Sequence, residues 1–225
     1  MYRKKMPKKI IIITISFILT VFLLINIAGI FIYNKGLKVL PSNMPVFLNL
    51  KEFSRFNELL WISETGNTAM KITPVNQYKY FLNIYFNRGS MENYQKMPDK
   101  NGWRIANQAA KLIIINSENQ NKTSMIDWHF DGYTVFIWVS KNISADKCLN
   151  IIADKSYFGN GYYGIQKAAA GYFGKKAEDL SDDEIIYLLT VFSNPILYDP
   201  VRQPGNFKRK FDSIRKTLQN EIFLN

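Results

Sequence analysis

The sequence predicts a mainly α-helical domain that follows one N-terminal transmembrane helix. Residues 10–32 form an uncharged, apolar stretch of 23 residues, long enough to cross a hydrocarbon core of about 30 Å as a helix. Beyond residue 50, apolar residues recur at helical spacing between helix start and stop signals, and the length suits one domain. The predicted parts are a basic tail (1–9), a transmembrane helix (10–32), a connector (33–50) and the helical domain (51–225).

Basic residues are distributed unevenly around the apolar stretch. Five precede it, whereas only Lys35 and Lys38 follow it closely. The positive-inside rule therefore predicts a cytoplasmic N-terminus and a domain on the outer or periplasmic face of the plasma membrane. The stretch is also longer than the apolar core of a signal peptide and lacks a small-residue cleavage site.

The exported part retains a moderate positive charge. Five of the 29 basic residues belong to the tail, which leaves 24 against 18 acidic residues, a net charge of +6. Nucleic acid is an unsuitable partner, because no basic stripe with stacking aromatics is present. Anionic lipid head groups or a pyrophosphate-bearing lipid suit this charge, and an ordinary solvated surface is the alternative. The single cysteine, Cys148, is predicted to be a core residue.

The first half of the domain contains one helical pattern and one aromatic segment. Residues 51–62 carry apolar side chains at helical spacing. Residues 77–86 are unusually rich in aromatic and apolar residues. They fit either the core or a surface that dips among lipid head groups.

The second half of the domain has clear local signals. Three glycines between Tyr157 and Gly164 predict sharp backbone turns, and an alanine-rich helix follows, ending at Gly174. Ser181 and Glu184 have capping-box spacing at the start of an apolar helix that stops at 194–195.

A last amphipathic helix is predicted near the end of the sequence. Asn206 is its expected cap, and apolar residues recur from Phe207 to Ile222 with basic residues between them. The apolar stripe is expected to close the domain.

The order of these features resembles the second half of the family 51 glycosyltransferases. These peptidoglycan glycosyltransferases occur alone or as one domain of bifunctional penicillin-binding proteins. The resemblance covers about a quarter of the chain and follows the order Phe-Gly-Asn-Gly-Tyr-Tyr-Gly-Ile-Gln, Ala-Ala, Tyr-Phe-Gly-Lys, Asp-Leu-Ser, Asn-Pro, Tyr-Asp-Pro. It implies a lysozyme-like fold and the polymerisation of lipid II, and the short chain suggests the monofunctional form.

The resemblance implies a general base at the glutamate that opens the family's first motif. Glu64 is the candidate, because it has the expected apolar lead-in and spacing to the next motif. Thr65, Thr68, Lys71 and Ile72 stand where the family has Asp, Phe, His and Gly, so only the glutamate carries over. A surface glutamate at a helix end is the alternative.

The family's second motif resembles residues 102–111. On a helix, Arg104, Gln108 and Lys111 share one face and provide donors for phosphate oxygens. Asn107 replaces a family glutamine, and a solvated polar helix face is the alternative. The agreeing residues are Gly102, Ile105, Gln108 and Lys111.

The family's third motif matches this sequence least. Counting back from the helix expected near residue 144 places the family's two glutamates at Gly132 and Ser140. Asp131 is one position away and is our second catalytic candidate. His129 or Lys122 is the candidate for the basic residue.

The sequence of this region also fits two other interpretations. Asp127, His129 and Asp131 invite a metal or triad site, but a lone histidine beside two aspartates is more often a surface residue. Residues 134–139 look like a strand locally, whereas the resemblance implies a helix, which we adopt.

The sequence thus leads to a peptidoglycan glycosyltransferase that uses lipid II and the growing glycan strand, next to membrane lipids and other cell-wall synthesis proteins. No motif requires a metal, although the resemblance is compatible with a divalent cation at the pyrophosphate. The alternative is a degenerate member that binds the precursor or a cell-wall enzyme without transfer, and a weaker one is a hydrolase with a second acid. The substrate-binding candidates are Arg104, Asn107, Gln108, Lys111, Tyr157, Gly159, Gly161, Gly164 and Gln166.

Overall fold

The computed structural model describes residues 7–41, 44, 50–76, 99–117 and 125–223. Within these ranges the fold is helical and no β-strand occurs, which confirms the predicted mainly α class. The elements are α1 (Lys8–Gly36), η1 (Leu37–Val39), α3 (Ser54–Thr65), α6 (Trp103–Ile115), α7 (Met125–Asn142), α8 (Ala145–Lys155), α9 (Ile165–Phe173), η4 (Ala177–Asp179), α10 (Asp182–Ser193) and α11 (Pro204–Phe223).

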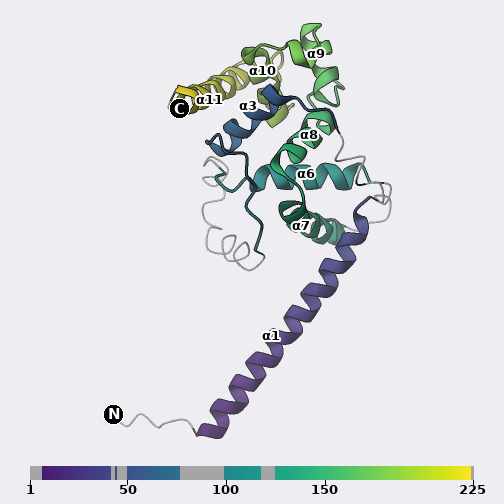
Figure 1. The fold of residues 1–225 in the computed structure, drawn as a ribbon, viewed down its shortest axis with the longest axis vertical. Helices are drawn as coiled ribbons and strands as arrows, with labels where there is room; N and C mark the ends of the chain where they lie inside the picture. The colour runs from purple at the N-terminus through teal and green to yellow at the C-terminus, as the bar shows by residue number, and fades with distance from the viewer. Residues whose placement is uncertain (1–6, 42–43, 45–49, 77–98, 118–124, 224–225) are drawn as a thin grey trace.

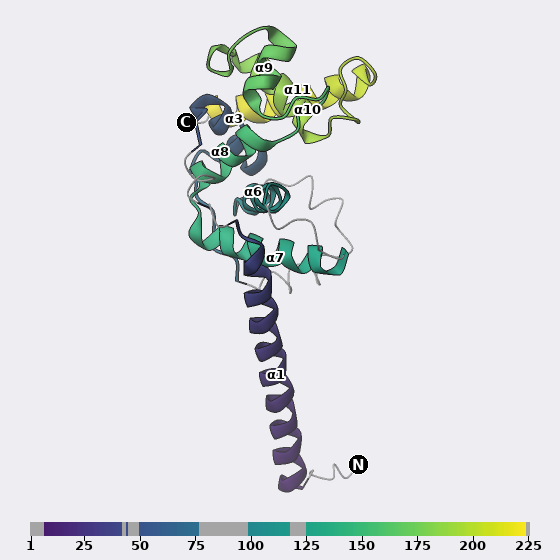
Figure 2. The same cartoon turned by 90° about the vertical axis from the view of Figure 1, so that its right-hand side faces the viewer.

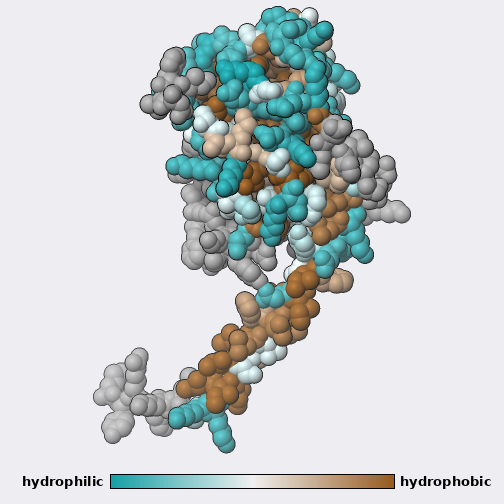
Figure 3. All heavy atoms as spheres, in the orientation of Figure 1, coloured by the Kyte–Doolittle hydropathy of each residue, from teal (hydrophilic) through white to brown (hydrophobic). Residues whose placement is uncertain are grey.

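Helix α1 extends away from the rest of the domain as a long stem (Figures 1 and 2). Its side chains are apolar and exposed over most of its length (Figure 3), and it is long and apolar enough to cross a membrane. Within the described part of the chain, its C-terminal end packs against the domain, on α7. A Cβ atom at Gly36 would lie 2.7 Å from Thr134 Oγ1, so this close approach requires a residue without a side chain.

The helices beyond α1 stack in layers away from the stem. α7 lies beside the end of α1, and α6 packs on α7 and α8 (Figures 1 and 2). α3 contacts both α8 and α11, and α11 contacts α10. α9 lies at the end of the domain opposite to α1. The domain therefore has one end at the stem and another far from it.

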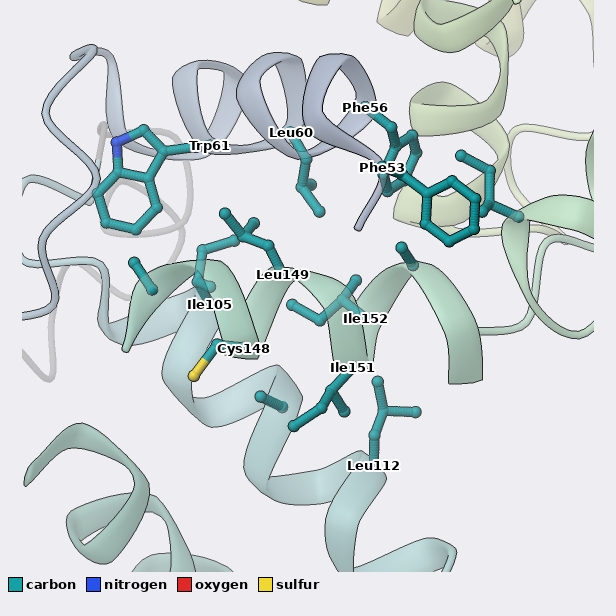
Figure 4. Packing of buried hydrophobic residues seen from close by; sticks show 14 of the residues in the cluster. Phe53, Phe56, Leu60, Trp61, Ile105, Leu112, Cys148, Leu149, Ile151 and Ile152 are labelled. Carbon is teal, nitrogen blue, oxygen red and sulfur yellow. The ribbon is translucent and has the colours of Figure 1, made fainter. Parts of the chain in front are cut away.

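The hydrophobic core lies between α3, α6 and α8 (Figure 4). Phe56 and Trp61 of α3 are fully buried, as are Leu149 and Ile152 of α8. Burying one such side chain stabilises the fold by about 1.5–3 kcal/mol. Cys148 is fully buried here too, as predicted, and burial raises the pKa of its thiol to about 12.

Local signals predicted α9 and α10 correctly. Gly174 adopts a left-handed conformation (φ 66°) and ends α9. Ser181 and Glu184 form the predicted capping box, in which the Ser181 hydroxyl accepts the Glu184 N–H and the Glu184 carboxylate accepts the Ser181 N–H. Half of the twelve residues of α10 are buried, and they lie between Ile185 and Val191.

Two local patterns gave a different result. Residues 134–139 have strand-like composition but belong to helix α7, as the family resemblance implied. The predicted cap at Asn206 is wrong, because α11 begins at Pro204 and the Phe207 N–H donates to the Gln203 carbonyl at 2.9 Å. Proline suits the first helical turn, since its missing N–H is not needed there. The aromatic segment 77–86 lies outside the described residues.

Candidate active site

A cleft of about 910 Å³ lies between α3, α6, α8, the α10–α11 connection and α11. Five residues proposed from the sequence line it, four of them on α6 and one on α3. They are Glu64, Arg104, Asn107, Gln108 and Lys111. The structure therefore brings the candidates from the first and second motifs to one site.

Glu64 lies in the last turn of α3, which ends where Gly66 adopts a left-handed conformation. Its side chain is 28% exposed, and its Oε2 atom lies 3.3 Å from Arg104 Nε. The Arg104 guanidinium also donates to the Glu64 backbone carbonyl at 2.7 Å. Arg104 thus holds the carboxylate at the cleft wall, so Glu64 is not a freely solvated residue at a helix end.

Asp99 fixes the position of this pair, although the sequence analysis missed it. The Asp99 backbone N–H donates to the Glu64 carbonyl at 2.9 Å, and its carboxylate accepts the Arg104 N–H at 2.5 Å. A carboxylate at the start of α6 also interacts favourably with the positive end of the helix dipole. Asp99 therefore connects the end of α3 to the start of α6.

The cleft carries more positive than negative charge. Lys111 of α6 and Lys210 of α11 line it together with Arg104, and Glu64 is the one acidic side chain among the described lining residues. Lys111 and Lys210 form no ion pair with any described residue. Such charged donors suit an anionic, oxygen-rich group such as a pyrophosphate.

A smaller pocket of about 170 Å³ adjoins this cleft, because Asn107 and Lys111 line both. Its other wall is α7, where Gly132 faces the pocket and Asp131 is buried, with 6% of its surface exposed. Gly132, at the position where the family has a glutamate, therefore lines this pocket without a carboxylate. A Cβ atom at Gly132 would have no neighbour within 4 Å, so the pocket has room for a side chain there.

The structure describes less of the other third-motif candidates. Lys122 lies outside the described residues. Asp127 and His129 belong to α7, but their side chains lie outside the described part of the structure. No group of three or more His, Cys, Asp or Glu residues suitable for a metal occurs among the described residues. Since the described cleft walls offer one carboxylate and Arg104 already pairs with it, they do not fit a divalent cation.

The glycine loop between α8 and α9 is not part of the described cleft lining. Its Phe158 side chain is fully buried and contacts the rings of Phe56 and Phe192, and Phe192 does line the cleft. The loop therefore supports the cleft wall from behind. Four predicted substrate-binding residues belong to this loop and do not line the described cleft: Tyr157, Gly159, Gly161 and Gly164.

Gln166 uses its side chain within the fold. Its Nε2 atom donates to Glu178 at 2.9 Å, and its Oε1 atom accepts the Ala177 N–H at 3.3 Å. These bonds tie α9 to η4. The role of Gln166 and of the loop glycines in substrate binding stays a prediction.

Comparison with known proteins identifies the family. The family model described as Transglycosylase matches residues 83–219, more than half of the sequence. The chain belongs to the transglycosylase family. This match includes α6, the glycine loop, α10 and most of α11, so the whole arrangement around the cleft except α3 falls within it.

Three curated relatives show how far this similarity extends. Penicillin-binding protein 2a of Streptococcus pneumoniae is 31% identical over 183 residues, which are 81% of this chain and 23% of that protein. Penicillin-binding protein 1F of Bacillus subtilis is 29% identical over 125 residues, 55% of this chain and 16% of that protein. The biosynthetic peptidoglycan transglycosylase of Xylella fastidiosa is 31% identical over 105 residues, 47% of this chain and 41% of that protein. The matched segments thus span less than half of each relative.

The transglycosylase cleft also contains residues that sequence reasoning did not select. Lys210, Ser213 and Thr217 of α11 line it at spacings of three and four residues, one helical face. This polar stripe beside the predicted apolar stripe was a usable signal. Asn194 and Tyr198 were part of the quoted resemblance but received no role, and both line the cleft.

Proposed function

We propose that this chain is a peptidoglycan glycosyltransferase that polymerises lipid II into glycan strands. The observation that carries the proposal is the cleft itself. It sets one carboxylate, Glu64, held by Arg104, beside Gln108, Lys111 and Lys210, whose side chains have no hydrogen bond or ion pair with the described residues. A base and a set of phosphate donors are what transfer from a lipid pyrophosphate requires.

In the proposed reaction, the 4-hydroxyl oxygen of one saccharide attacks the anomeric carbon of another. The bond between that carbon and the pyrophosphate oxygen breaks as the new glycosidic bond forms, with inversion at carbon. Glu64 accepts the hydroxyl proton, and the lipid pyrophosphate leaves with the electron pair. Lys111 and Lys210 stabilise the negative charge that develops on the leaving pyrophosphate, with Arg104 contributing while it orients Glu64.

Helix α1 supports a membrane location for this reaction. We propose that it anchors the protein with a cytoplasmic N-terminus, since five basic residues precede its apolar part and few follow it. Membrane lipids then surround α1, and a lipid-linked substrate is available at its end. A reporter active only outside the cytoplasm should work after Asn225 and fail before Met1, and the reverse result would refute this orientation.

A second candidate function is binding of the lipid-linked precursor, or of another cell-wall synthesis protein, without transfer. The observation that favours it is Gly132, which leaves no carboxylate at the family's third-motif position in the pocket of α6 and α7. Gly132→Glu provides a direct comparison, because its side chain has room. If wild type is inactive and Gly132→Glu polymerises lipid II, the wild-type chain is a binder with an intact cleft.

The deciding experiment is incubation of the purified full chain in lipid nanodiscs with lipid II, followed by separation of any glycan polymer. Polymer formed by wild type and strongly reduced in Glu64→Gln supports the transferase. Lipid II binding without polymer supports the second candidate. If wild type neither binds lipid II nor forms polymer, both candidate functions are refuted.

A further inference from the structure

Two tyrosine rings form an exposed pair on the glycine loop. Tyr157 and Tyr163 are 41% and 60% exposed, and their ring centroids are 4.9 Å apart at an interplanar angle of 38°. The two residues form an antiparallel β-bridge, so their backbones fix the separation of the rings. Each tyrosine combines an apolar ring with a polar hydroxyl, a combination that is enriched at binding interfaces.

The loop that carries this pair is held rigidly. The Phe158 N–H donates to the Tyr162 carbonyl at 2.8 Å, and the Gly164 N–H donates to the Ser156 carbonyl at 2.8 Å. From the side of α9, the Tyr172 hydroxyl donates to the Phe158 carbonyl at 2.9 Å. Burial raises the pKa of Tyr172 to about 12, so this donor keeps its proton at neutral pH. The ring pair is therefore preorganised, which lowers the entropic cost of binding a ligand.

The location of the pair favours a saccharide over a lipid. The loop adjoins α9, at the end of the domain opposite to α1 (Figure 1), so a bilayer around α1 is remote from it. It nevertheless lies next to the cleft wall. A Cβ atom at Gly159 would be 3.5 Å from Pro195 Cβ, and Asn194, one residue earlier, lines the cleft. A chain of sugars that leaves the cleft away from the membrane can reach the ring pair.

We propose that Tyr157 and Tyr163 form a platform outside the cleft that binds the sugar rings of a glycan strand. Sugar rings present faces of C–H groups that pack on aromatic rings, while their hydroxyls remain in water and can bond to the tyrosine hydroxyls. The inference rests on the proposed function for the identity of the glycan. Its consequence is that a strand stays attached beside the cleft between successive transfers.

The test measures binding of a soluble, lipid-free N-acetylglucosamine oligomer to the full chain in nanodiscs, without lipid II. Wild type should bind, Tyr163→Ala should weaken binding about tenfold, and Tyr163→Phe, which keeps the ring, should bind within about threefold of wild type. Ile196→Ala is the matched control, because Ile196 is an apolar side chain that is 86% exposed and not part of the platform. It should leave binding unchanged.

Tyr157→Ala provides a second variant in case Tyr163→Ala disturbs the loop, and thermal unfolding of each variant reports that disturbance. No binding by wild type, or equal binding by wild type and both alanine variants, would overturn the inference. The binding assay involves no transfer. If the protein binds the oligomer through Tyr163 but makes no polymer from lipid II, the platform is supported and only the proposed function is rejected. Where polymer is made, Tyr163→Ala should yield shorter strands.

Discussion

The cleft and the glycine loop use their polar groups in opposite ways. In the cleft, Gln108 and Lys111 have no polar partner among the described residues and face open space. In the loop region, Gln166 and Tyr172 bond to neighbouring parts of the fold. The second motif, on α6, matches the family only in part, whereas the loop matches it closely. Close resemblance in the loop glycines therefore reflects the requirements of the fold, whereas the chemistry that we propose depends on the less similar α3–α6 face.

Backbone geometry explains why the loop keeps its sequence pattern. Gly159, Gly161 and Gly164 have positive φ angles, as does Asn160, a conformation that other residues adopt with strain. A Cβ atom at Gly171 would lie 2.2 Å from the Tyr162 ring. These positions are constrained whether or not the protein is catalytic, so the loop alone does not separate an enzyme from a binder.

The largest expected effect in the cleft is that of Glu64→Gln on transfer. The amide keeps the shape of the carboxylate but does not accept the hydroxyl proton, and general-base catalysis contributes about 10²- to 10⁴-fold. Polymerisation of lipid II should fall by a factor in this range, while the thermal midpoint and lipid II binding change little. Unchanged polymerisation would remove Glu64 from the mechanism.

The matching change in the loop is Gly164→Ala, which should act on stability. The added Cβ would lie 2.5 Å from the Asp154 carbonyl oxygen, in a residue with φ of 84°. We expect a loss of about 2–4 kcal/mol in the free energy of unfolding, from backbone strain and overpacking. Urea unfolding measures it. Gly174→Ala is the control, because its Cβ would meet nothing within 4 Å, and it should cost only the strain of a positive φ of 66°.

Sequence reasoning predicted the helices better than the site because helix signals are local. The capping box at Ser181 and the glycine stop at Gly174 involve residues within one turn, so their spacing is visible in the sequence. The Asn206 cap failed because Pro204 offers an earlier helix start. Residues 134–139 show that tertiary packing overrides β-propensity.

The site was only half predictable because its walls are assembled from distant segments. Glu64 and Arg104 were both selected, but nothing in the sequence indicates that they pair at 3.3 Å through the turn that Asp99 organises. Lys210 reaches the cleft only because α11 packs against α3. Its neighbour Lys208 pairs with Asp212 instead. One basic helix thus holds a cleft residue and a surface residue two positions apart.

Because Lys111 and Lys210 line the cleft and Lys208 does not, the three lysines should differ in their effect on affinity. A charged hydrogen bond contributes roughly 1.5–3 kcal/mol, or about 10- to 150-fold in affinity. Lys111→Ala should weaken binding of a polyprenyl pyrophosphate by a factor in this range, and Lys210→Ala should act in the same direction. Lys208→Ala is the control with the same charge change outside the cleft, and its effect should be much smaller. Equal effects of Lys111→Ala and Lys208→Ala would indicate diffuse electrostatic attraction in place of a site.

The smallest expected effects come from two glutamines, one in each region. Gln166→Ala removes the bonds to Glu178 and to the Ala177 N–H, and a typical hydrogen bond contributes about 0.5–1.5 kcal/mol net. Its free energy of unfolding should therefore fall by about 1–2 kcal/mol with pyrophosphate binding unchanged. Gln108→Ala should show the reverse, because its side chain faces the cleft and has no described partner: stability within about 0.5 kcal/mol of wild type and affinity reduced about two- to tenfold. Urea unfolding and titration with a polyprenyl pyrophosphate, applied to both variants, measure the two quantities. If Gln166→Ala weakens pyrophosphate binding as much as Gln108→Ala does, α9 takes part in pyrophosphate recognition, and the proposed difference between the cleft and the loop region fails.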